Sequence, residues 1–556
     1  MSEKTKLQNT SIHFNRLIKA DVRTVEPQQF EASFSFKLGD SQNGVYIHPR
    51  NYEVESYLFF PPQMKLNPNS YPMEHFYRDM KSYINFRIPK LSYREIIGLT
   101  DNPNRSPLKK IMRELSLVHP NTSFARSSFV RQEARIFGCS YYNYLMRKVK
   151  KLERRISAAG SADVIDPSQD AITINFIEDT LQKIKSIFLE WHKFSNAKQL
   201  PKPANLQIEF DLVDEYLVHI TKDFLLYAVE SLDLLKLSRK VKFRLQYKLR
   251  VSLRALRIYC KNCQYIWIDD RSSDAQLEAY QYRRGLLKRK VWSSLYLDPR
   301  VKPLFTIQKQ AGAMLAAGAA AIWAFLAEIT IRTNSAFRNG SLSASIEAST
   351  FIIITAFALA YILKDRIKEL GRGYFKWGIF GRLPDSSNKI VYPKDSSGQE
   401  DVEVGTYEER VRFTAHDRLP SDIEAIAEEY FPYDEEESSS IISYQQKYSL
   451  KDKPIRSLRR KMRAIYSFYR LNISSLLGPL DQPAGPSSVP TQDLHVTQRI
   501  LPKVYHIDLI VKISGKVKGK SHPIYRIFRI VVNKDGILRL ENWSSKFSFM
   551  HEPKES

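Results

Sequence analysis

The sequence predicts an α+β protein in which a two-helix transmembrane hairpin joins two cytoplasmic arms. Two observations lead to this prediction. The first is a pair of apolar stretches, at residues 311–331 and 349–363, in a chain that is otherwise rich in charge. The second is a change of pattern along the chain, from strand-like to helical segments before the apolar pair and back to strand-like segments after it.

These patterns divide the chain into five regions. Residues 1–105 are rich in predicted strands, residues 106–308 form a helical bundle, and residues 309–366 form the hairpin. A juxtamembrane segment follows at 367–384, and residues 385–556 form a smaller α+β domain with a helical, charged insertion. The first two regions make up the N-terminal arm, and the last region makes up the C-terminal arm.

The N-terminal arm begins with strands and continues with helices. Apolar and polar residues alternate in FEASFSFKL (30–38), and SYLFFPP (56–62) and SYINFRIP (82–89) look similar, as half-buried strands do. From about Ser106 the apolar residues recur at the three- and four-residue spacing of a helix. The predicted helices are PLKKIMRELSLV, FVRQEARIFGCSYYNYLMRKVKKLERRI, INFIEDTLQKIKSIFLEWHKF and FDLVDEYLVHITKDFLLYAVESLDLLKL.

The hairpin prediction depends on length and on apolar content. A helix rises about 1.5 Å per residue, so about 20 residues cross a hydrocarbon core of about 30 Å, and Ala311–Ile331 has that length. Its one charged residue, Glu328, lies near the end, where the cost of inserting a charge falls. The second stretch, Ser349–Leu363, is shorter but richer in Ile, Leu and Phe, so its insertion is the more favourable.

Small residues on the first helix predict a packing face. Gly312, Ala316 and Ala320 recur every four residues, and such a face lets two helix backbones approach closely in lipid. The second helix is one candidate for the partner, and another copy of the chain, giving a homo-oligomer, is the other. The alternative is an Ala-rich helix buried in a soluble core.

The distribution of Lys and Arg predicts the orientation of the hairpin. Cations cluster before the first apolar stretch and after the second, whereas the connecting loop has only Arg332 and Arg338. Positively charged flanks stay in the cytoplasm. The predicted location is therefore the cell membrane, as a multi-pass protein with both termini cytoplasmic.

The C-terminal arm is predicted to contain strands around a charged insertion. The strands at 388–415 and 504–543 are expected to share one sheet, and Asp535-Gly536 indicates a hairpin turn. Between them, the acidic piece DIEAIAEEYFPYDEEESSS is followed by the basic piece KDKPIRSLRRKMRAIYSFYR, and opposite charges so close are typical of a helical hairpin or of solvated faces.

The net charge of +25 predicts anionic partners, which are nucleic acid, anionic lipid headgroups or acidic proteins. Four cations of one segment, Arg250, Arg254, Arg257 and Lys261, fall on one face of a predicted helix. This face suits anionic lipid or phosphate groups. The predicted bilayer favours the lipid headgroups over nucleic acid, and a solvated or ion-paired face is the structural alternative.

No pattern indicates a cofactor, a metal or a catalytic residue. Cys260 and Cys263 have the spacing of a zinc or redox pair, but no second ligand pair follows, so buried thiols are the favoured interpretation. The prediction for His219 is a hydrogen-bonded core histidine. Asp269-Asp270 is expected to cap a helix, and His416 to lie in a surface turn. The sequence contains no GxxxxGK[ST], GxGxxG, HExxH or GxSxG pattern.

The predicted function is that of a membrane-anchored, cytoplasm-facing binding, scaffold or sensor protein. One alternative is an oligomeric pore, in which Glu328 and Glu347 would lie near the outer mouth and select cations. The other alternative is a membrane-tethered enzyme that acts on lipid or nucleic acid. Sequence alone does not show whether the chain is an enzyme.

Overall fold

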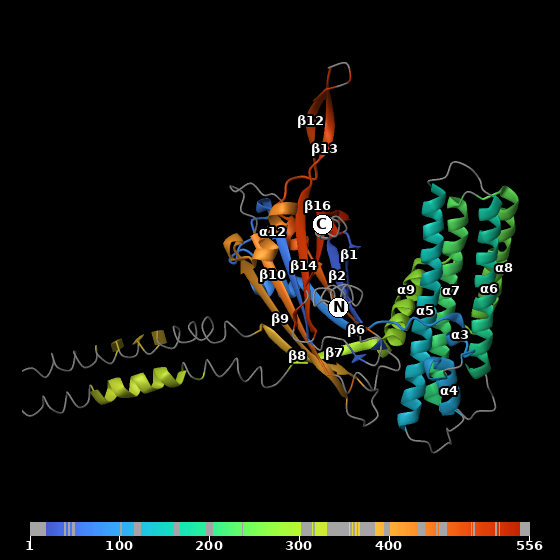
Figure 1. The fold of residues 1–556 in the computed structure, drawn as a ribbon, viewed down its shortest axis with the longest axis horizontal. Coiled ribbons are helices and arrows are strands. Elements are labelled where there is room, and N and C mark those ends of the chain that lie inside the picture. Colours follow the sequence, from blue (N-terminus) through green and yellow to red (C-terminus); the bar gives the residue numbers. More distant parts are fainter. Residues whose placement is uncertain are drawn as a thin grey trace, which may run out of the picture.

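The computed structural model resolves a large β-sheet beside a helical bundle (Figure 1). The structure describes residues 18–37, 41–42, 45–46, 51–100, 103–115, 124–160, 167–195, 204–235, 237–301, 314, 317–330, 355, 358–359, 362–363, 365–366, 384–393, 401–431, 440–451, 454, 464–490, 492, 495–517, 520–521 and 523–544.

Twelve strands of the described chain form the path of the main sheet, in the order β1-β2-β11-β6-β7-β8-β9-β10-β5-β14-β16-β17, and β15 (Lys520–Ser521) pairs with β14 beside this path. All of these pairings are antiparallel. In chain order the twelve strands are β1 (Ile18–Glu26), β2 (Gln29–Lys37), β5 (Asn51–Phe60), β6 (Met80–Phe86), β7 (Tyr296–Val301), β8 (Ser386–Tyr392), β9 (Val402–Thr414), β10 (Ser440–Leu450), β11 (Ala464–Asn472), β14 (Tyr505–Val517), β16 (Ile524–Asn533) and β17 (Gly536–Asn542).

The two ends of the sheet approach each other, so the sheet is nearly closed. The backbone N–H of Ile537 donates to the carbonyl of Pro27 at 2.6 Å, and the side-chain amide of Gln28 donates to the carbonyl of Asp535 at 3.3 Å. Gly536 makes this approach possible, because a Cβ there would overlap the Pro27 carbonyl oxygen. Gly536 also opens β17 after the turn from β16, so the predicted Asp535-Gly536 turn is confirmed.

Alternation along the strands places apolar side chains inside this near-barrel. Phe30, Phe34 and Phe36 of β2 belong to the main core, as do Tyr52, Val54, Leu58 and Phe60 of β5. Tyr57 and Phe59 of β5 belong instead to a second, smaller core with apolar residues of the segment 419–431. The strands predicted at 30–38, 56–62 and 82–89 are therefore confirmed within β2, β5 and β6. Five large tyrosines fill the interior together with them, namely Tyr52, Tyr407, Tyr444, Tyr448 and Tyr469.

Strands from the two predicted arms are interleaved in one sheet. β11 from the C-terminal part lies between β2 and β6 from the N-terminal part, and β5 lies between β10 and β14. The predicted strands at 388–415 and 504–543 do belong to one sheet, as β8, β9, β14, β16 and β17. The N-terminal and C-terminal parts are therefore not separate folded arms, because neither end of the chain completes the sheet alone.

The charged insertion of the C-terminal part is only partly helical. α12 (Ser421–Tyr430) covers the first part of the acidic piece, whereas the end of the basic piece, residues 464–470, is the first part of strand β11. Along β11, buried residues alternate with more exposed ones; the buried ones include Ile465, Ser467, Tyr469 and Leu471. This period of two is that of a strand, and it predicts the structure of the segment better than its basic composition does.

Further elements complete the described chain. Two short antiparallel pairs lie outside the main sheet, β3 (Ser41–Gln42) with β4 (Val45–Tyr46), and β12 (Ala484–Pro490) with β13 (Val496–Pro502). Figure 1 shows the second pair projecting from one end of the sheet. The short helices are η1 (Pro62–Met64), α2 (Met73–Asp79), α3 (Tyr93–Ile96), η2 (Pro103–Arg105), η3 (Ser293–Leu295), η5 (His416–Arg418) and α14 (Ser474–Leu477).

The helical bundle forms where helices were predicted. Its elements are α4 (Pro107–Leu115), α5 (Phe124–Gly160), α6 (Pro167–Ser195), α7 (Ala204–Leu234), α8 (Arg239–Asn262) and α9 (Asp274–Trp292). Trp191 of α6 is fully buried and stacks on Phe137 of α5, with ring centroids 4.8 Å apart. α9 is the bundle helix nearest the sheet in Figure 1, whereas α6 and α8 lie on the remote side.

The predicted transmembrane hairpin is wrong. Among the residues that the structure describes, no helix is both long enough and apolar enough to cross a membrane. The fold class built on the hairpin, and the multi-pass location in the cell membrane with cytoplasmic termini, are contradicted by the same finding.

The predicted small-residue face falls mainly outside the described residues. Gly312 and Ala316 lie there, as do Arg332 and Arg338 of the connecting loop. Ala320 is described and is buried, with 1% of its surface exposed. The packing of this face against another copy of the chain stays a prediction.

Candidate functional site

The predicted basic face is exposed along α8. Arg250, Arg254, Arg257 and Lys261 are all exposed residues of this helix. Arg257 is ion-paired with Asp269, with 2.6 Å between its guanidinium nitrogen and the carboxylate oxygen. Within the described chain the other three make no ion pair. Their charges are therefore available to an anionic ligand or to solvent.

Apolar side chains share this face of α8 with the cations. At 100° per residue they fall on the same side of the helix, and each is exposed by more than two fifths: Phe243, Tyr247, Val251 and Ile258. A face that mixes exposed apolar and cationic side chains differs from an ordinary solvated face, which is polar throughout. We call these eight residues, four cationic and four apolar, the α8 face.

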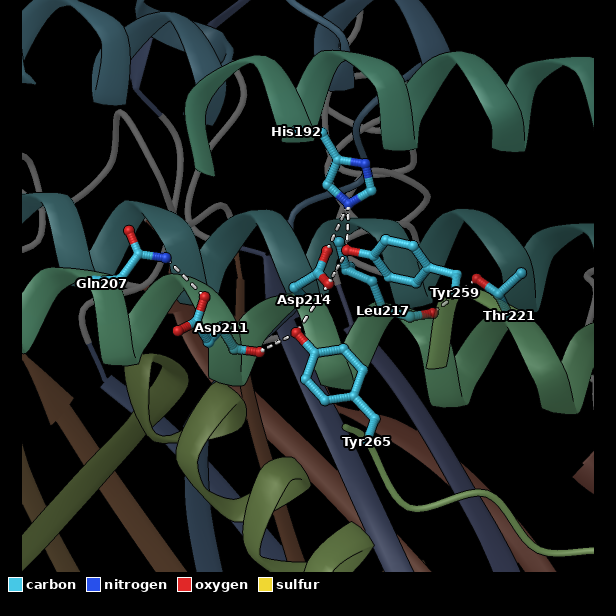
Figure 2. Close-up of polar contacts among 8 residues, drawn as sticks. All are labelled: His192, Gln207, Asp211, Asp214, Leu217, Thr221, Tyr259 and Tyr265. Atoms are coloured by element: carbon cyan, nitrogen blue, oxygen red, sulfur yellow. Dashed lines mark hydrogen bonds and ion pairs between the residues drawn. The ribbon is translucent and has the colours of Figure 1, made fainter. Parts of the chain in front are cut away.

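The opposite side of α8 is fixed to the bundle by a partly buried polar network around Asp214 (Figure 2). Asp214 of α7 accepts hydrogen bonds from the hydroxyls of Tyr259 on α8, at 2.7 Å, and of Tyr265, at 3.0 Å. His192 of α6 lies with its Nε2 3.0 Å from Asp214 and 2.8 Å from the Tyr259 hydroxyl. Three helices and the segment after α8 are thus joined at one carboxylate.

The Asp214 network is a structural joint rather than a reactive centre. Burial raises the pKa of Tyr259 and of Tyr265, and the negative charge of Asp214 raises both further. Both hydroxyls therefore remain protonated donors at physiological pH. No residue of this network was singled out by sequence patterns, because His192, Asp214 and Tyr259 lie far apart in the chain.

A second group of polar side chains lies on α7 beside this network. The Arg283 guanidinium pairs with Glu215 at 2.5 Å. Burial opposes ionisation of Glu215, but the neighbouring His219 and Arg283 outweigh it and hold the pKa of Glu215 below its usual value. His219 is buried, as predicted, with its Nε2 3.7 Å from the Glu215 carboxylate, which is too long for a hydrogen bond. Neither ring nitrogen of His219 has a hydrogen-bond partner among the described residues, so its prediction as a hydrogen-bonded core histidine is wrong.

The cysteine pair lies in the same part of the bundle as free thiols. Cys260 is buried and Cys263 is half-buried. Burial raises the pKa of Cys260 to about 12, so at neutral pH it is a protonated thiol and a poor nucleophile or metal ligand. Within the described residues no group of His, Cys, Asp and Glu could hold a metal ion.

A site that the sequence patterns did not indicate lies on the outer face of β1, β2, β11 and β6. Register places Phe468 of β11 directly opposite Tyr83 of β6, and Arg470 opposite Glu31 of β2. Tyr466 is two residues before Phe468 and therefore points to the same face. We call Tyr83, Tyr466, Phe468 and Arg470 the aromatic platform.

The rings of the aromatic platform are in contact and partly exposed. Tyr83 and Phe468 stack with centroids 4.9 Å apart and an interplanar angle of 19°. Tyr466 lies 5.4 Å from Phe468. The Arg470 guanidinium carbon lies 5.3 Å from the Phe468 ring centre and 5.8 Å from that of Tyr83. Tyr83 is 41% exposed, so one large aromatic surface faces outward next to a cation.

A buried carboxylate holds the platform in place. Glu31 is 0% exposed. It accepts hydrogen bonds from Arg470 Nε at 2.9 Å, from Arg23 Nε at 2.9 Å and from the Tyr466 hydroxyl at 3.3 Å. The Glu31 carboxylate thus orients two arginines and one ring. Because Glu31 carries one negative charge and Arg23 and Arg470 carry one positive charge each, the group keeps a net positive charge. A charge buried in this way requires such partners.

Further cations reach the platform from β6 and α9. Lys81 is exposed and lies directly opposite Arg470 in the sheet. Partial burial lowers the pKa of Lys288 on α9, and the positive charges of Arg284, Arg470 and Arg23 lower it further. Cations of the bundle and of the sheet therefore lie near one another, and an anion bound among them would reduce their mutual repulsion.

Aromatic side chains of the bundle adjoin these cations. The Lys288 ammonium lies 5.7 Å from the ring centre of Trp292, and Tyr142 of α5 meets Trp292 edge-on at 5.4 Å. Burial raises the pKa of Tyr142, and the positive charges of Arg23 and Arg284 offset part of that rise. The aromatic and cationic character therefore continues from the sheet onto α5 and α9.

The remaining residues that the sequence singled out do not form a site. Asp269 pairs with Arg257 and turns the chain by accepting a hydrogen bond from the backbone N–H of Arg271. Its predicted role as a helix cap is wrong, because Ser273 precedes α9 and supplies that cap. His416 lies in η5 and is exposed, which confirms the predicted surface turn.

One groove, of about 330 Å³, lies at the edge of the strands β5, β9, β10 and β14. Its charged lining consists of Glu53, Glu408 and Lys447, and Lys447 pairs with Glu53 at 3.3 Å. The groove therefore carries a net negative charge and does not suit the anionic partners that the overall charge predicts.

No family model matches the sequence, and comparison with characterised proteins and with solved structures finds no similar chain. The function is therefore argued from the residues of the molecule alone.

Proposed function

We propose that the protein is a binding protein for nucleic acid, with the aromatic platform and its neighbouring cations as the binding surface. The observation that carries this proposal is a pair of partly exposed, stacked rings beside a cation on one sheet face. The ring centres of Tyr83 and Phe468 are 4.9 Å apart, and the Arg470 guanidinium carbon lies 5.3 Å from the Phe468 ring centre. Rings that stack on bases and cations that contact phosphates are the two components of nucleic-acid binding.

The charge of the chain supports the same proposal. The net charge of +25 gives a long-range field that attracts polyanions and speeds their association. Sequence alone favoured anionic lipid over nucleic acid, because a predicted hairpin would have placed the chain beside a bilayer. The structure contradicts the hairpin, so this reason for preferring lipid no longer holds. The aromatic platform then favours nucleic acid.

The cations of the surface provide the test. Lys81→Glu/Lys288→Glu changes two exposed side chains that make no ion pair among the described residues. Fluorescence anisotropy with a labelled oligonucleotide, measured between about 50 and 200 mM salt, gives the salt dependence of binding. We expect the slope of log Kobs against log salt to fall in magnitude by about 1.4, because each lost phosphate contact removes about 0.7 for single strands.

A matched control distinguishes the effect of these two positions from the effect of a lower net charge. Lys185→Glu/Lys240→Glu makes the same change of charge at two exposed lysines, one on α6 and one on α8. Figure 1 shows these two helices on the side of the bundle remote from the sheet. It should leave the slope close to that of the unchanged protein. Equal effects of the two double variants, or no binding by the unchanged protein at about 50 mM salt, would contradict the proposal.

The α8 face supports a second candidate function, peripheral binding to anionic lipid headgroups. Its exposed Val251 and Ile258 cannot stack on bases but can enter the headgroup layer, beside Arg250 and Arg254. Each cation near an anionic surface is worth about 1 kcal/mol. Arg250→Gln/Arg254→Gln should therefore lower partitioning onto phosphatidylserine-containing vesicles by about 30-fold. Vesicle binding that is unchanged in the variant, or equal on neutral vesicles, would exclude this function.

The pore hypothesis required the transmembrane hairpin, which the structure contradicts. A scaffold or sensor role, and an enzyme that acts on nucleic acid, remain compatible with a nucleic-acid binding surface, but no described residue pair carries them.

A further inference from the structure

We infer that the ligand of the aromatic platform is single-stranded nucleic acid, whose bases stack on Tyr83 and Phe468 while Arg470 and Lys81 contact the flanking phosphates. This inference rests on the proposed function and names its ligand class. Single strands offer the flat faces of their bases, whereas a duplex keeps those faces stacked inside the helix.

The geometry of the rings favours bases as the bound groups. Tyr83 and Phe468 are nearly parallel, at 19°, so each can continue a stack. Tyr83 is 41% exposed although it stands on a sheet whose inner face is well packed. An aromatic ring left open at the surface in this way does not contribute its full area to the fold. A base that covers the ring would remove this area from water.

The arrangement is fixed before any ligand binds. Arg470 is held by Glu31 at 2.9 Å, and Tyr466 is held by the same carboxylate at 3.3 Å. β11, which carries Tyr466, Phe468 and Arg470, is paired along these residues with β2 on one side and with β6 on the other, so its backbone is held on both sides. A surface fixed in this way loses little conformational entropy on binding.

Base stacking on a sheet also explains the position of the cations. Register places Lys81 opposite Arg470. Two residues along each strand, and therefore on the same face, Tyr83 lies opposite Phe468. Along a strand the same face recurs every two residues, about 6.7 Å apart. This step is similar to the spacing of phosphates along an extended single strand, so one strand of nucleic acid can place a base on the rings and a phosphate at the cations.

The test compares two probes and three variants. The probes are a fluorescein-labelled oligothymidylate of about 20 nucleotides and a duplex of the same length. We expect the unchanged protein to bind the single strand more tightly. Tyr83→Ala should weaken binding of the single strand by about 5- to 150-fold, the range found when one stacking ring is removed. Tyr83→Phe keeps the ring and should bind like the unchanged protein.

Tyr282→Ala is the matched control, because Tyr282 is another exposed tyrosine, 71% exposed, and lies about 120° around α9 from Lys288. It should leave binding unchanged. The inference is overturned if Tyr83→Ala binds the single strand as the unchanged protein does, or if Tyr282→Ala weakens it equally. If the inference fails in this way, the proposed function still holds provided that the protein binds the duplex and that Lys81→Glu/Lys288→Glu weakens this binding. Failure of the single-strand inference can therefore be told apart from failure of the proposed function.

Discussion

Glu31 is the residue on which the platform depends most, and its replacement by Gln tests the arrangement. The change keeps the shape of the side chain but removes its charge. Both carboxylate oxygens accept in the structure, one from Arg23 and Tyr466 and the other from Arg470. In the Glu31→Gln variant one of these oxygens becomes an amide nitrogen, which is a donor facing an arginine donor.

The magnitude follows from the hydrogen bonds that are lost. A hydrogen bond to a charged group is worth about 1.5–3 kcal/mol, and at least one is removed. The arginine side chains are 60% and 32% exposed, so solvent screens part of this interaction. We therefore expect Glu31→Gln to lower the free energy of unfolding by about 2 kcal/mol.

The assay is equilibrium unfolding in urea, followed by tryptophan fluorescence. Asp21→Asn is the matched control, because Asp21 is an exposed acid on β1 whose carboxylate has no partner in the described chain. It should change the free energy of unfolding by less than about 0.5 kcal/mol. If Glu31→Gln is as mild as Asp21→Asn, the buried carboxylate does not hold the platform and the reasoning fails.

Two further predictions concern the bundle. Tyr259→Phe removes the hydroxyl that donates to Asp214 and should lower the free energy of unfolding by about 1.5–3 kcal/mol in urea. Tyr282→Phe, at a tyrosine that is 71% exposed, should have no effect; equal effects would argue against the joint at Asp214. Arg283→Ala should destabilise the protein by about 1 kcal/mol at pH 7, after screening by solvent. Because Glu215 has a lowered pKa when folded, its contribution is present at neutral pH and is lost as the pH falls below about 4.5. Unfolding at several pH values should therefore show the difference between the variant and the unchanged protein shrinking below that pH, and a constant difference would contradict this explanation.

Local elements of the fold could be predicted because their signals are local. The helices α5, α6 and α7 have the spacing of amphipathic helices, and the strands β2 and β6 alternate in the period of two. The turn at Asp535-Gly536 was recognisable because this dipeptide favours a hairpin turn wherever it separates two alternating runs. Such signals require no knowledge of distant partners.

The apolar stretch at residues 311–331 misled the prediction because apolar content alone does not decide what surrounds a helix. Sheet order could not be predicted for a related reason. β11 lies between two strands that precede it by more than 370 residues, and no local pattern specifies that pairing. The segment AIYSFYR was interpreted as part of the charged insertion, either in a helical hairpin or as a solvated face. Its alternating Tyr466, Phe468 and Arg470 are the signal that would have indicated an exposed strand face.

Of the two candidate binding surfaces, only the cations of α8 could be predicted from the sequence. Helical spacing placed Arg250, Arg254, Arg257 and Lys261 on one face of a predicted helix, and in the structure all four are exposed residues of α8. Their binding of anionic lipid or phosphate stays a prediction. The aromatic platform needs β6 and β11 side by side, so it exists only once the sheet is formed.

Zero-length ultraviolet crosslinking tests the central claim most directly. Irradiation of the full chain with an oligothymidylate, followed by digestion and mass spectrometry, identifies the residues that touch the bases. The platform predicts adducts on Tyr83 or Phe468, and their loss in Tyr83→Ala. Adducts confined to peptides of α8, or adducts that Tyr83→Ala leaves unchanged, would contradict the claim that this sheet face binds nucleic acid.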